Sequence, residues 1–286
     1  MNVMKIKIVT DNGHALSKEL VKKYDIRLFN CPIYFAGKEY LESNTSREVF
    51  LRDLKEKRGF PKTSAPGVAD LSRIFKDLWQ NYQILLVLMS KELTKATYLN
   101  IKQAIKDFPE TKIRIIDTRQ AGLGKDLIVI EIARLVESGK TDSEIFTEAE
   151  KIVSRTNSIL ALPDLEYLYQ GGRIGKAKVL IGSLIKIIPL VGFRNQEGIV
   201  SPLGKARTIR QANEIMVEQI KRDLKEKNGK FIISMIGEID NQPASQDLEN
   251  LLKQNFKNIE IIKGEIGCTA TCYMGPKAWG IGYTIM

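Results

Sequence analysis

The stretch from Gly171 to Arg210 combines dense positive charge with a long apolar run. Eight basic residues stand there against one acid, Glu197, so this stretch carries +7 of the chain's +10. The apolar run, Val179 to Val191, is shorter than the about 20 residues that cross a bilayer, so we expect it to be buried in the protein. A positive rim around an apolar segment suits a ligand with an apolar body and an anionic head, whereas the alternative is a core helix with solvated flanks. The eight basic residues are Arg173, Lys176, Lys178, Lys186, Arg194, Lys205, Arg207 and Arg210.

The sequence Gly171-Gly172-Arg173 opens this stretch. Paired glycines let the backbone approach a ligand closely, and the planar guanidinium of Arg173 can bind a carboxylate or phosphate through two parallel hydrogen bonds. The other interpretation is a plain turn followed by a surface arginine.

Polar residues follow three predicted strands in the first half of the chain. They are Thr10, Asp11, Ser90, Asp117 and Thr118. Side chains just past the carboxyl ends of parallel strands meet in one crevice, where helix N-termini favour an anion. Because Asp11 and Asp117 could also hold a divalent ion, the sequence leaves open an alternative function, a metal-dependent enzyme on a small phosphorylated or carboxylated substrate.

Several kinds of chemistry are disfavoured by residues that the chain lacks. The only histidine is His14, which leaves little room for a Ser-His-Asp triad. Cys268 and Cys272 have no second cysteine pair to complete a zinc site, so we expect no metal and no cofactor. The sequence contains no GxxxxGK[ST] phosphate loop.

Charge and cysteine use also constrain partners and location. The pI is about 9.3, but outside the Gly171 to Arg210 stretch the basic residues alternate with acids, as in REVFLRDLKEKR. We therefore expect no nucleic-acid partner. Three cysteines give no disulfide framework, and no secretory signal is visible at the start, so we expect a cytoplasmic protein.

Alternating strand and helix patterns predict the elements that position these residues. The predicted strands are 5–10, 26–35, 84–89, 112–116, 158–162, 230–236, 259–263 and 280–285, with a hairpin over 193–206. The predicted helices are 17–24, 47–57, 68–82, 94–108, 125–137, 143–155, 176–187, 208–227 and 245–256, with a helical turn at 164–169 and a loop at 59–67. Capping boxes at Thr45 with Glu48 and at Thr141 with Glu144 would start two of the helices.

This order predicts an α/β protein of two domains. Residues 1–160 would form an open, mostly parallel sheet with helices on both faces, and residues 161–286 a second α/β domain. The length of 286 residues suits two domains.

Several motifs, spread along nearly the whole chain, resemble those of one protein family. Tyr167 to Ile174, YLYQGGRI, is similar to the YLxxGGRI signature of the DegV family of bacterial fatty-acid-binding proteins, the FakB-like acyl carriers. Further likenesses to that family are Thr10-Asp11-Asn12, Thr63 to Gly67, Ser90 to Tyr98, Ile116-Asp117-Thr118 with Gly122 to Gly124, Glu197-Gly198 with Lys205 to Thr208, and Gly275-Pro276.

The resemblance implies a fold, a ligand and a partner. A long-chain fatty acid would lie in a tunnel between the two domains, as a ligand and not a cofactor. The chain would be non-catalytic and would present the carboxylate to a separate fatty-acid kinase subunit that makes the acyl phosphate. Transient access to a membrane surface is compatible with such a carrier.

The same resemblance assigns candidate residues. The carboxylate would be bound by residues at the tunnel mouth, namely Thr63, Ser64, Ser90, Lys91, Thr94, Arg173 and Tyr273. The kinase would dock on a basic face, namely Arg194, Lys205, Arg207 and Arg210.

Four positions depart from the family pattern. Tyr273 replaces a histidine and Lys91 replaces a serine, Ile187-Ile188-Pro189 stands for an Ile-Lys-Pro element, and Lys277 ends the Gly-Pro-Gly element. Tyr273 can still donate an O–H to a carboxylate, and Lys91 can supply charge.

Overall fold

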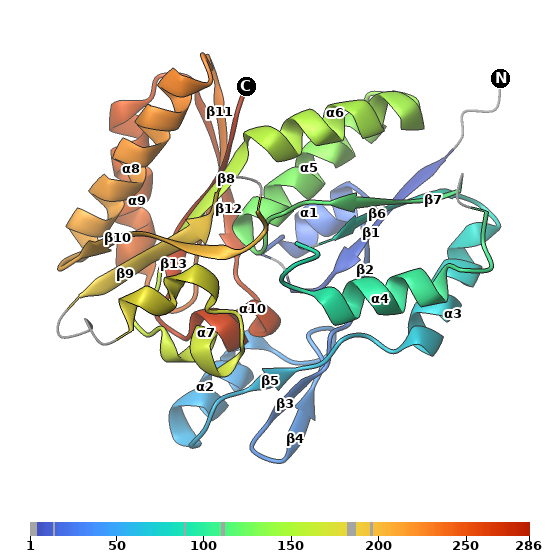
Figure 1. Cartoon of the computed structure of the whole chain (residues 1–286), viewed down its shortest axis with the longest axis horizontal. Coiled ribbons are helices and arrows are strands. Elements are labelled where there is room, and N and C mark those ends of the chain that lie inside the picture. The colour runs from blue at the N-terminus through green and yellow to red at the C-terminus, as the bar shows by residue number, and fades with distance from the viewer. Residues whose placement is uncertain (1–4, 14, 89, 110–111, 182–186, 195–196) are drawn as a thin grey trace.

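The computed structural model describes residues 5–13, 15–88, 90–109, 112–181, 187–194 and 197–286. Their strands form two large sheets and one small one, and helices cover both faces of the larger sheets (Figure 1). The predicted α/β class, with a mostly parallel N-terminal sheet, is confirmed. Within these described ranges, none of the helices is both long enough and apolar enough to cross a membrane.

The first sheet has the order β2-β1-β6-β7, and all of its strand pairs are parallel. Successive strand residues point to opposite faces, so Ile8 packs with α5 and Val9 packs with α3 and α4. The strands are β1 (Ile6–Asp11), β2 (Arg27–Phe29), β6 (Gln83–Leu88) and β7 (Ile113–Asp117). The helices that accompany them are α1 (Lys18–Lys23), α3 (Val68–Trp79), α4 (Lys95–Ala104), α5 (Leu123–Glu137) and α6 (Asp142–Arg155).

The second sheet has the order β10-β9-β8-β13-β11-β12, and only its β11–β12 pair is parallel. Its strands are β8 (Thr156–Ala161), β9 (Ile188–Phe193), β10 (Val200–Ala206), β11 (Ile232–Glu238), β12 (Ile259–Glu265) and β13 (Trp279–Ile285). One face packs against α8 (Ile209–Glu226) and α9 (Gln242–Asn255). The other face packs against α5, which lies between the two large sheets (Figure 1). Buried on nearly every side, α5 is apolar around most of its circumference.

The change from one sheet to the other occurs before residue 160. Strand β8 pairs with β9 and β13 of the second sheet, whereas the division into 1–160 and 161–286 puts β8 almost wholly in the first unit. The chain therefore reaches the second sheet at Thr156, directly after α6. The division into two domains itself stays a prediction.

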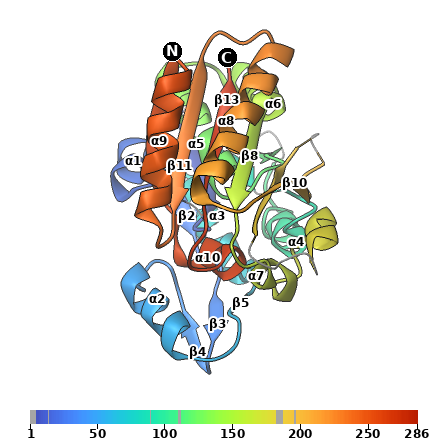
Figure 2. The ribbon, with the colours of Figure 1, turned by 90° about the vertical axis from the view of Figure 1, so that its left-hand side faces the viewer.

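A small antiparallel sheet, β4-β3-β5, projects with α2 from one end of the molecule (Figure 2). Its elements are β3 (Ile33–Phe35), β4 (Lys38–Tyr40), β5 (Lys62–Thr63) and α2 (Arg47–Glu56). Phe35 and Phe50 pack with Cys268 and Cys272 of α10 (Cys268–Met274). Phe60 packs edge-on against Tyr167 of α7 (Glu166–Gln170), with the ring centroids 5.0 Å apart. Residues 33–60, from the N-terminal part of the chain, thus pack against α7 and α10, which belong to the second half.

This small sheet corrects two predictions. The predicted strand 26–35 is two strands in different sheets, because the chain turns at Asn30 to Pro32, where the Oδ1 of Asn12 accepts the Cys31 N–H at 3.1 Å. The predicted loop 59–67 contains β5, which pairs with β3.

The structure confirms one of the two predicted capping boxes and corrects the predictions for the apolar run 179–191. The capping box of Thr141 and Glu144 is confirmed, but α2 is capped by Ser46 and not by Thr45. In place of the predicted helix 176–187 the chain forms a short 3₁₀ helix, η1 (Gly175–Leu180), and residues 182–186, with Lys186, lie outside the described residues. The expected burial of the whole apolar run is wrong, since Val179 is 71% exposed. His14 also lies outside the described residues.

Candidate functional site

A cavity lies between the two large sheets and encloses roughly 960 Å³ of empty space, including the space at its mouth. Its wall takes residues from β5, α4 and the loop before α5 on one side, and from β8, α7, β9, β10 and α10 on the other.

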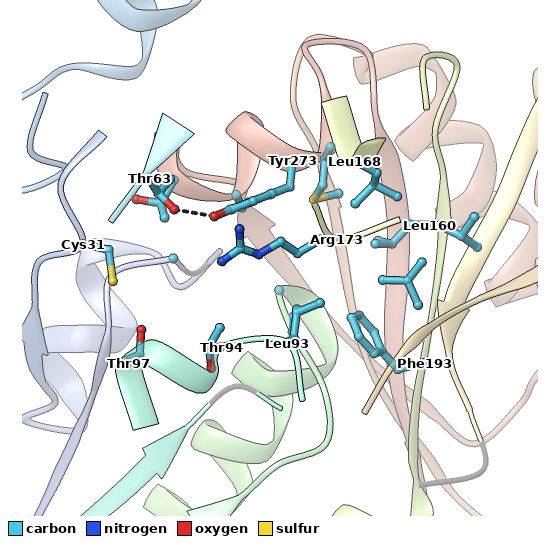
Figure 3. A pocket seen from close by; sticks show the side chains of 18 of the residues that line it. Cys31, Thr63, Leu93, Thr94, Thr97, Leu160, Leu168, Arg173, Phe193 and Tyr273 are labelled. Atoms are coloured by element: carbon cyan, nitrogen blue, oxygen red, sulfur yellow. Dashed lines mark hydrogen bonds between the residues drawn. The ribbon is translucent and has the colours of Figure 1, made fainter. Parts of the chain in front are cut away.

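One part of the wall is hydrocarbon. Figure 3 shows Leu160, Leu168 and Phe193 together, away from the polar side chains. The larger apolar side chains on the side of the second sheet and its helices that line the cavity are Leu160, Leu162, Leu168, Val191, Phe193, Val200 and Met274. Every second residue of an extended chain points to the same face. This accounts for Leu160 with Leu162, at the end of β8, and for Val191 with Phe193 of β9.

The opposite part of the wall carries hydroxyl groups and one guanidinium. Thr63, Thr94, Thr97 and the Tyr273 hydroxyl gather there, and the guanidinium of Arg173 points toward them and away from Phe193 (Figure 3). Ser64 and Thr269 also line the cavity. Arg173 is the only charged side chain among the described residues of the wall, so the cavity favours a ligand with one anionic group.

The two glycines before Arg173 fix its direction. Gly172 has a φ of +68°, a left-handed conformation that other residues rarely adopt. A Cβ at Gly171 would lie 2.6 Å from the Tyr273 ring, so only glycine leaves room for that ring. Arg173 then donates to the Gly171 carbonyl at 2.6 Å, and its guanidinium carbon lies 4.9 Å from the centroid of the Tyr273 ring.

Tyr273 stands at the centre of the polar part. Its hydroxyl is hydrogen-bonded to the Thr63 hydroxyl. Burial raises the pKa of Tyr273, an effect that the Arg173 charge and the Thr63 hydrogen bond oppose only partly. The phenol is therefore neutral at physiological pH and takes part through hydrogen bonds alone.

The structure brings five of the seven candidate head-group residues to the cavity wall and leaves two outside it. Thr63, Ser64, Thr94, Arg173 and Tyr273 line the cavity. Ser90 and Lys91 have other contacts. The buried Ser90 hydroxyl donates to the Gly198 carbonyl at 2.5 Å, and the Lys91 ammonium lies over the Tyr98 ring, 5.1 Å from its centroid.

The strand-end carboxylates are held by groups of the protein. The buried Asp11 accepts from the fully buried ammonium of Lys125 at 3.0 Å and from the Gly13 N–H at 2.8 Å. Asp117 accepts two backbone N–H groups, from Lys91 and Arg119, each at 3.2 Å. Over the described ranges, no three or more His, Cys, Asp or Glu side chains gather in a way that could hold a metal ion.

The four candidate docking residues differ in their surroundings. Arg194 is three-quarters buried and donates to the buried Asp223 at 2.8 Å, so it holds the end of β9 to α8. Lys205 and Arg207 are exposed. Arg210 is exposed but forms ion pairs with Glu214 and Asp247, each at 2.9 Å.

Sequence reasoning missed part of the wall. Thr97 lies in the first turn of α4, three residues after Thr94, which precedes the helix, and this helical spacing was a usable signal. Thr269 belongs to α10, which was not predicted as a helix. The first turn of that helix is capped by Glu42, which accepts the backbone N–H groups of Cys268 and Thr269 at 2.6 and 2.8 Å.

The protein is thus an α/β protein with two large sheets packed around α5, and the wall of the cavity between them is polar at one end and apolar at the other. Comparison with known proteins places it further. The family model for uncharacterised proteins of the DegV family matches residues 5–285. A DegV domain-containing protein of Clostridium acetobutylicum is 30% identical over 284 residues, covering 98% of each chain. The chain belongs to the DegV family.

Two further relatives carry names that describe a ligand. A fatty acid-binding protein of Thermotoga maritima is 26% identical over 292 residues, covering 99% of each chain. The solved structure of a fatty-acid-binding DegV family protein from Thermus thermophilus is similar with a TM-score of 0.91 at 23% identity, covering 99% of this chain and 100% of that one. This second likeness supports the fold.

Proposed function

We propose that the chain binds one long-chain fatty acid in this cavity. The observation that carries the proposal is the distribution of polarity along the cavity wall. Arg173 and the hydroxyls of Thr63 and Thr94 face one end, and apolar side chains line the other. The carboxylate would accept hydrogen bonds at the polar end, because burying it without partners would cost several kcal/mol. The acyl chain would extend along Leu160 and Phe193.

The energy available is sufficient for tight binding. Each buried CH₂ contributes about 0.8 kcal/mol, so a chain of about sixteen carbons gives roughly 12 kcal/mol before the cost of ordering. Affinity should therefore rise with acyl length until the apolar part is full.

The test begins with the bound lipid. Protein purified from cells and extracted with solvent should yield about one long-chain fatty acid per chain by mass spectrometry. After removal of lipid, Arg173→Ala should weaken binding about 10- to 100-fold, the equivalent of one lost charge-assisted hydrogen-bonding group. Thr63→Ala should weaken it less, and Arg222→Ala, an exposed arginine on α8, should leave it unchanged. Protein with no affinity for fatty acids would end the proposal.

We further propose that the chain acts as a non-catalytic carrier for a fatty-acid kinase subunit. Support comes from the exposed basic side chains of Lys205, Arg207 and Arg210 on the β10–α8 segment. Charge complementarity of this kind mainly accelerates and orients encounter. Arg194, paired with Asp223, would hold this segment in place instead of contacting the partner.

The carrier role has its own assay. Acyl phosphate should form only when the loaded protein, a fatty-acid kinase subunit and Mg-ATP are all present. Arg207→Glu should slow its formation and leave fatty-acid affinity unchanged, with Lys257→Glu, an exposed lysine beyond α9, as the control. Acyl phosphate made by this chain alone would contradict the carrier role.

A further inference from the structure

Strand β7 forms an edge of the first sheet. In the described part of the chain it pairs only with β6, through Ile113 to Asp117. Alternate N–H and C=O groups of an edge strand point outward and can pair with another strand. The edge is therefore a template for an added segment of extended chain.

A basic groove runs along this edge, with roughly 1,120 Å³ of empty space that includes open solvent above it. It lies between α4, on one face of the sheet, and α6, on the other. Its wall carries four cations and, among its described residues, no acid. The cations are Lys91, Lys102, Lys106 and Arg114.

Most of this charge lacks an anionic partner among the residues that the structure describes. Lys102 and Lys106 are exposed, and neither makes an ion pair with any residue in the described ranges. Arg114 is partly compensated by Asp142, at 3.4 Å, while its guanidinium carbon lies 3.7 Å from the centroid of the Phe146 ring. Lys91 lies over the Tyr98 ring. The groove thus offers positive charge that the described residues leave largely uncompensated.

Apolar side chains line the groove together with these cations. Half-buried aromatic and aliphatic groups form its floor, namely Tyr98, Ile105, Phe108, Ile115 and Phe146. A bound strand points alternate side chains to opposite sides, so acidic side chains on the α4 side would reach the lysines, while apolar ones on the α6 side would rest on Phe146. Arg114 and Ile115 are consecutive residues of β7 and so face opposite sides of the sheet.

We propose that this groove docks an acidic, extended segment of a partner protein, which adds to β7 as a further strand. Backbone hydrogen bonds to the edge would supply affinity, and the lysines would select acidic sequences. The groove is distinct from the fatty-acid cavity, but the two share α4: Thr94 and Thr97 line the cavity, and Tyr98 and Lys102 line the groove. The proposal does not depend on what the cavity binds.

The test uses a synthetic peptide in which glutamate alternates with valine. Its affinity for the whole protein is measured by fluorescence anisotropy at low ionic strength, beside a lysine–valine peptide of equal length. The glutamate–valine peptide should bind and the lysine–valine peptide should not. In hydrogen–deuterium exchange, binding should slow exchange in β7 (Ile113–Asp117), because outward N–H groups become hydrogen-bonded. A peptide with alternate backbone amides methylated should lose both effects.

Charge variants locate the contact. Lys102→Glu with Lys106→Glu should weaken peptide binding roughly tenfold or more, since each reversal replaces an attraction by a repulsion. Lys225→Glu with Lys257→Glu makes the same charge change at exposed positions near the second sheet and should have little effect. The proposal is wrong if the groove variant binds as the wild type does, or if β7 gains no protection. It is also wrong if duplex DNA or inorganic polyphosphate binds more tightly than the peptide, because the occupant would then be a polyanion of another class.

Discussion

Asp126 provides the sharpest test of the electrostatics beneath the cavity. It is fully buried in the first turn of α5, where one carboxylate oxygen accepts the Ala15 N–H at 2.6 Å. The other oxygen, Oδ1, has no hydrogen-bond partner among the described residues and lies 3.7 Å from the Lys125 ammonium. Burial raises the pKa of Asp126 from 3.8 to about 7, although Lys125 and the Ala15 N–H oppose the rise.

The sign of the pH effect follows from this pKa. The folded-state pKa lies above the unfolded one, so the contribution of Asp126 to stability is greatest below about pH 4 and falls as pH rises to about 7. A pKa difference of one corresponds to about 1.4 kcal/mol. From pH 5 to pH 8 the wild type should therefore lose roughly 2 to 3 kcal/mol through this group.

Asp126→Asn removes the titration and keeps the shape. Free energies of unfolding from urea titrations at several pH values should show the variant gaining on the wild type by that amount between pH 5 and pH 8. Because the variant also changes hydrogen bonding, the slope of the difference carries the test, whatever its offset. Asp107→Asn, at an exposed position, accounts for the loss of charge itself. Parallel curves for Asp126→Asn and wild type would refute the reasoning.

Three further predictions concern the second sheet and the cavity. Asp223→Ala should lower the free energy of unfolding by about 3–5 kcal/mol in urea titrations, because it leaves the partly buried guanidinium of Arg194 and the buried hydroxyl of Tyr283 without the carboxylate that accepts their hydrogen bonds. Leu160→Phe should narrow the apolar part of the cavity, so that affinity for long acyl chains falls more than affinity for short ones in a chain-length series. Tyr273→His places a titrating group beside Arg173, so fatty-acid affinity measured from pH 8 to pH 6 should rise relative to wild type as the imidazole gains charge.

The sequence predicted regular elements well where the signals were local. Thr141 with Glu144 correctly marks the start of α6, and apolar periodicity finds α3, α5 and α8. Elements that depend on distant partners were missed. Helix α10 contains two β-branched threonines and two cysteines, and it begins where Glu42, more than two hundred residues away, caps its N–H groups. No local pattern contains that partner.

The candidate site follows the same distinction. Gly171-Gly172-Arg173 has a local meaning, because a positive φ and a close aromatic ring both require glycine, and Arg173 does face the cavity. Ser90 was placed at the site by strand-end reasoning, yet its hydroxyl donates to Gly198, which approaches from the second sheet. Which strand-end groups reach the cavity depends on how two sheets pack, and spacing along one of them does not encode that.

Tyr273 changes how charge is distributed at the polar end of the cavity. The resemblance to the family led us to expect a histidine there, a group that can add positive charge near neutral pH. The phenol cannot, because burial raises its pKa further from neutrality. The positive charge on the described wall therefore rests on Arg173. Since the Tyr273 hydroxyl already bonds Thr63, a carboxylate entering here meets hydroxyls that are oriented before it arrives.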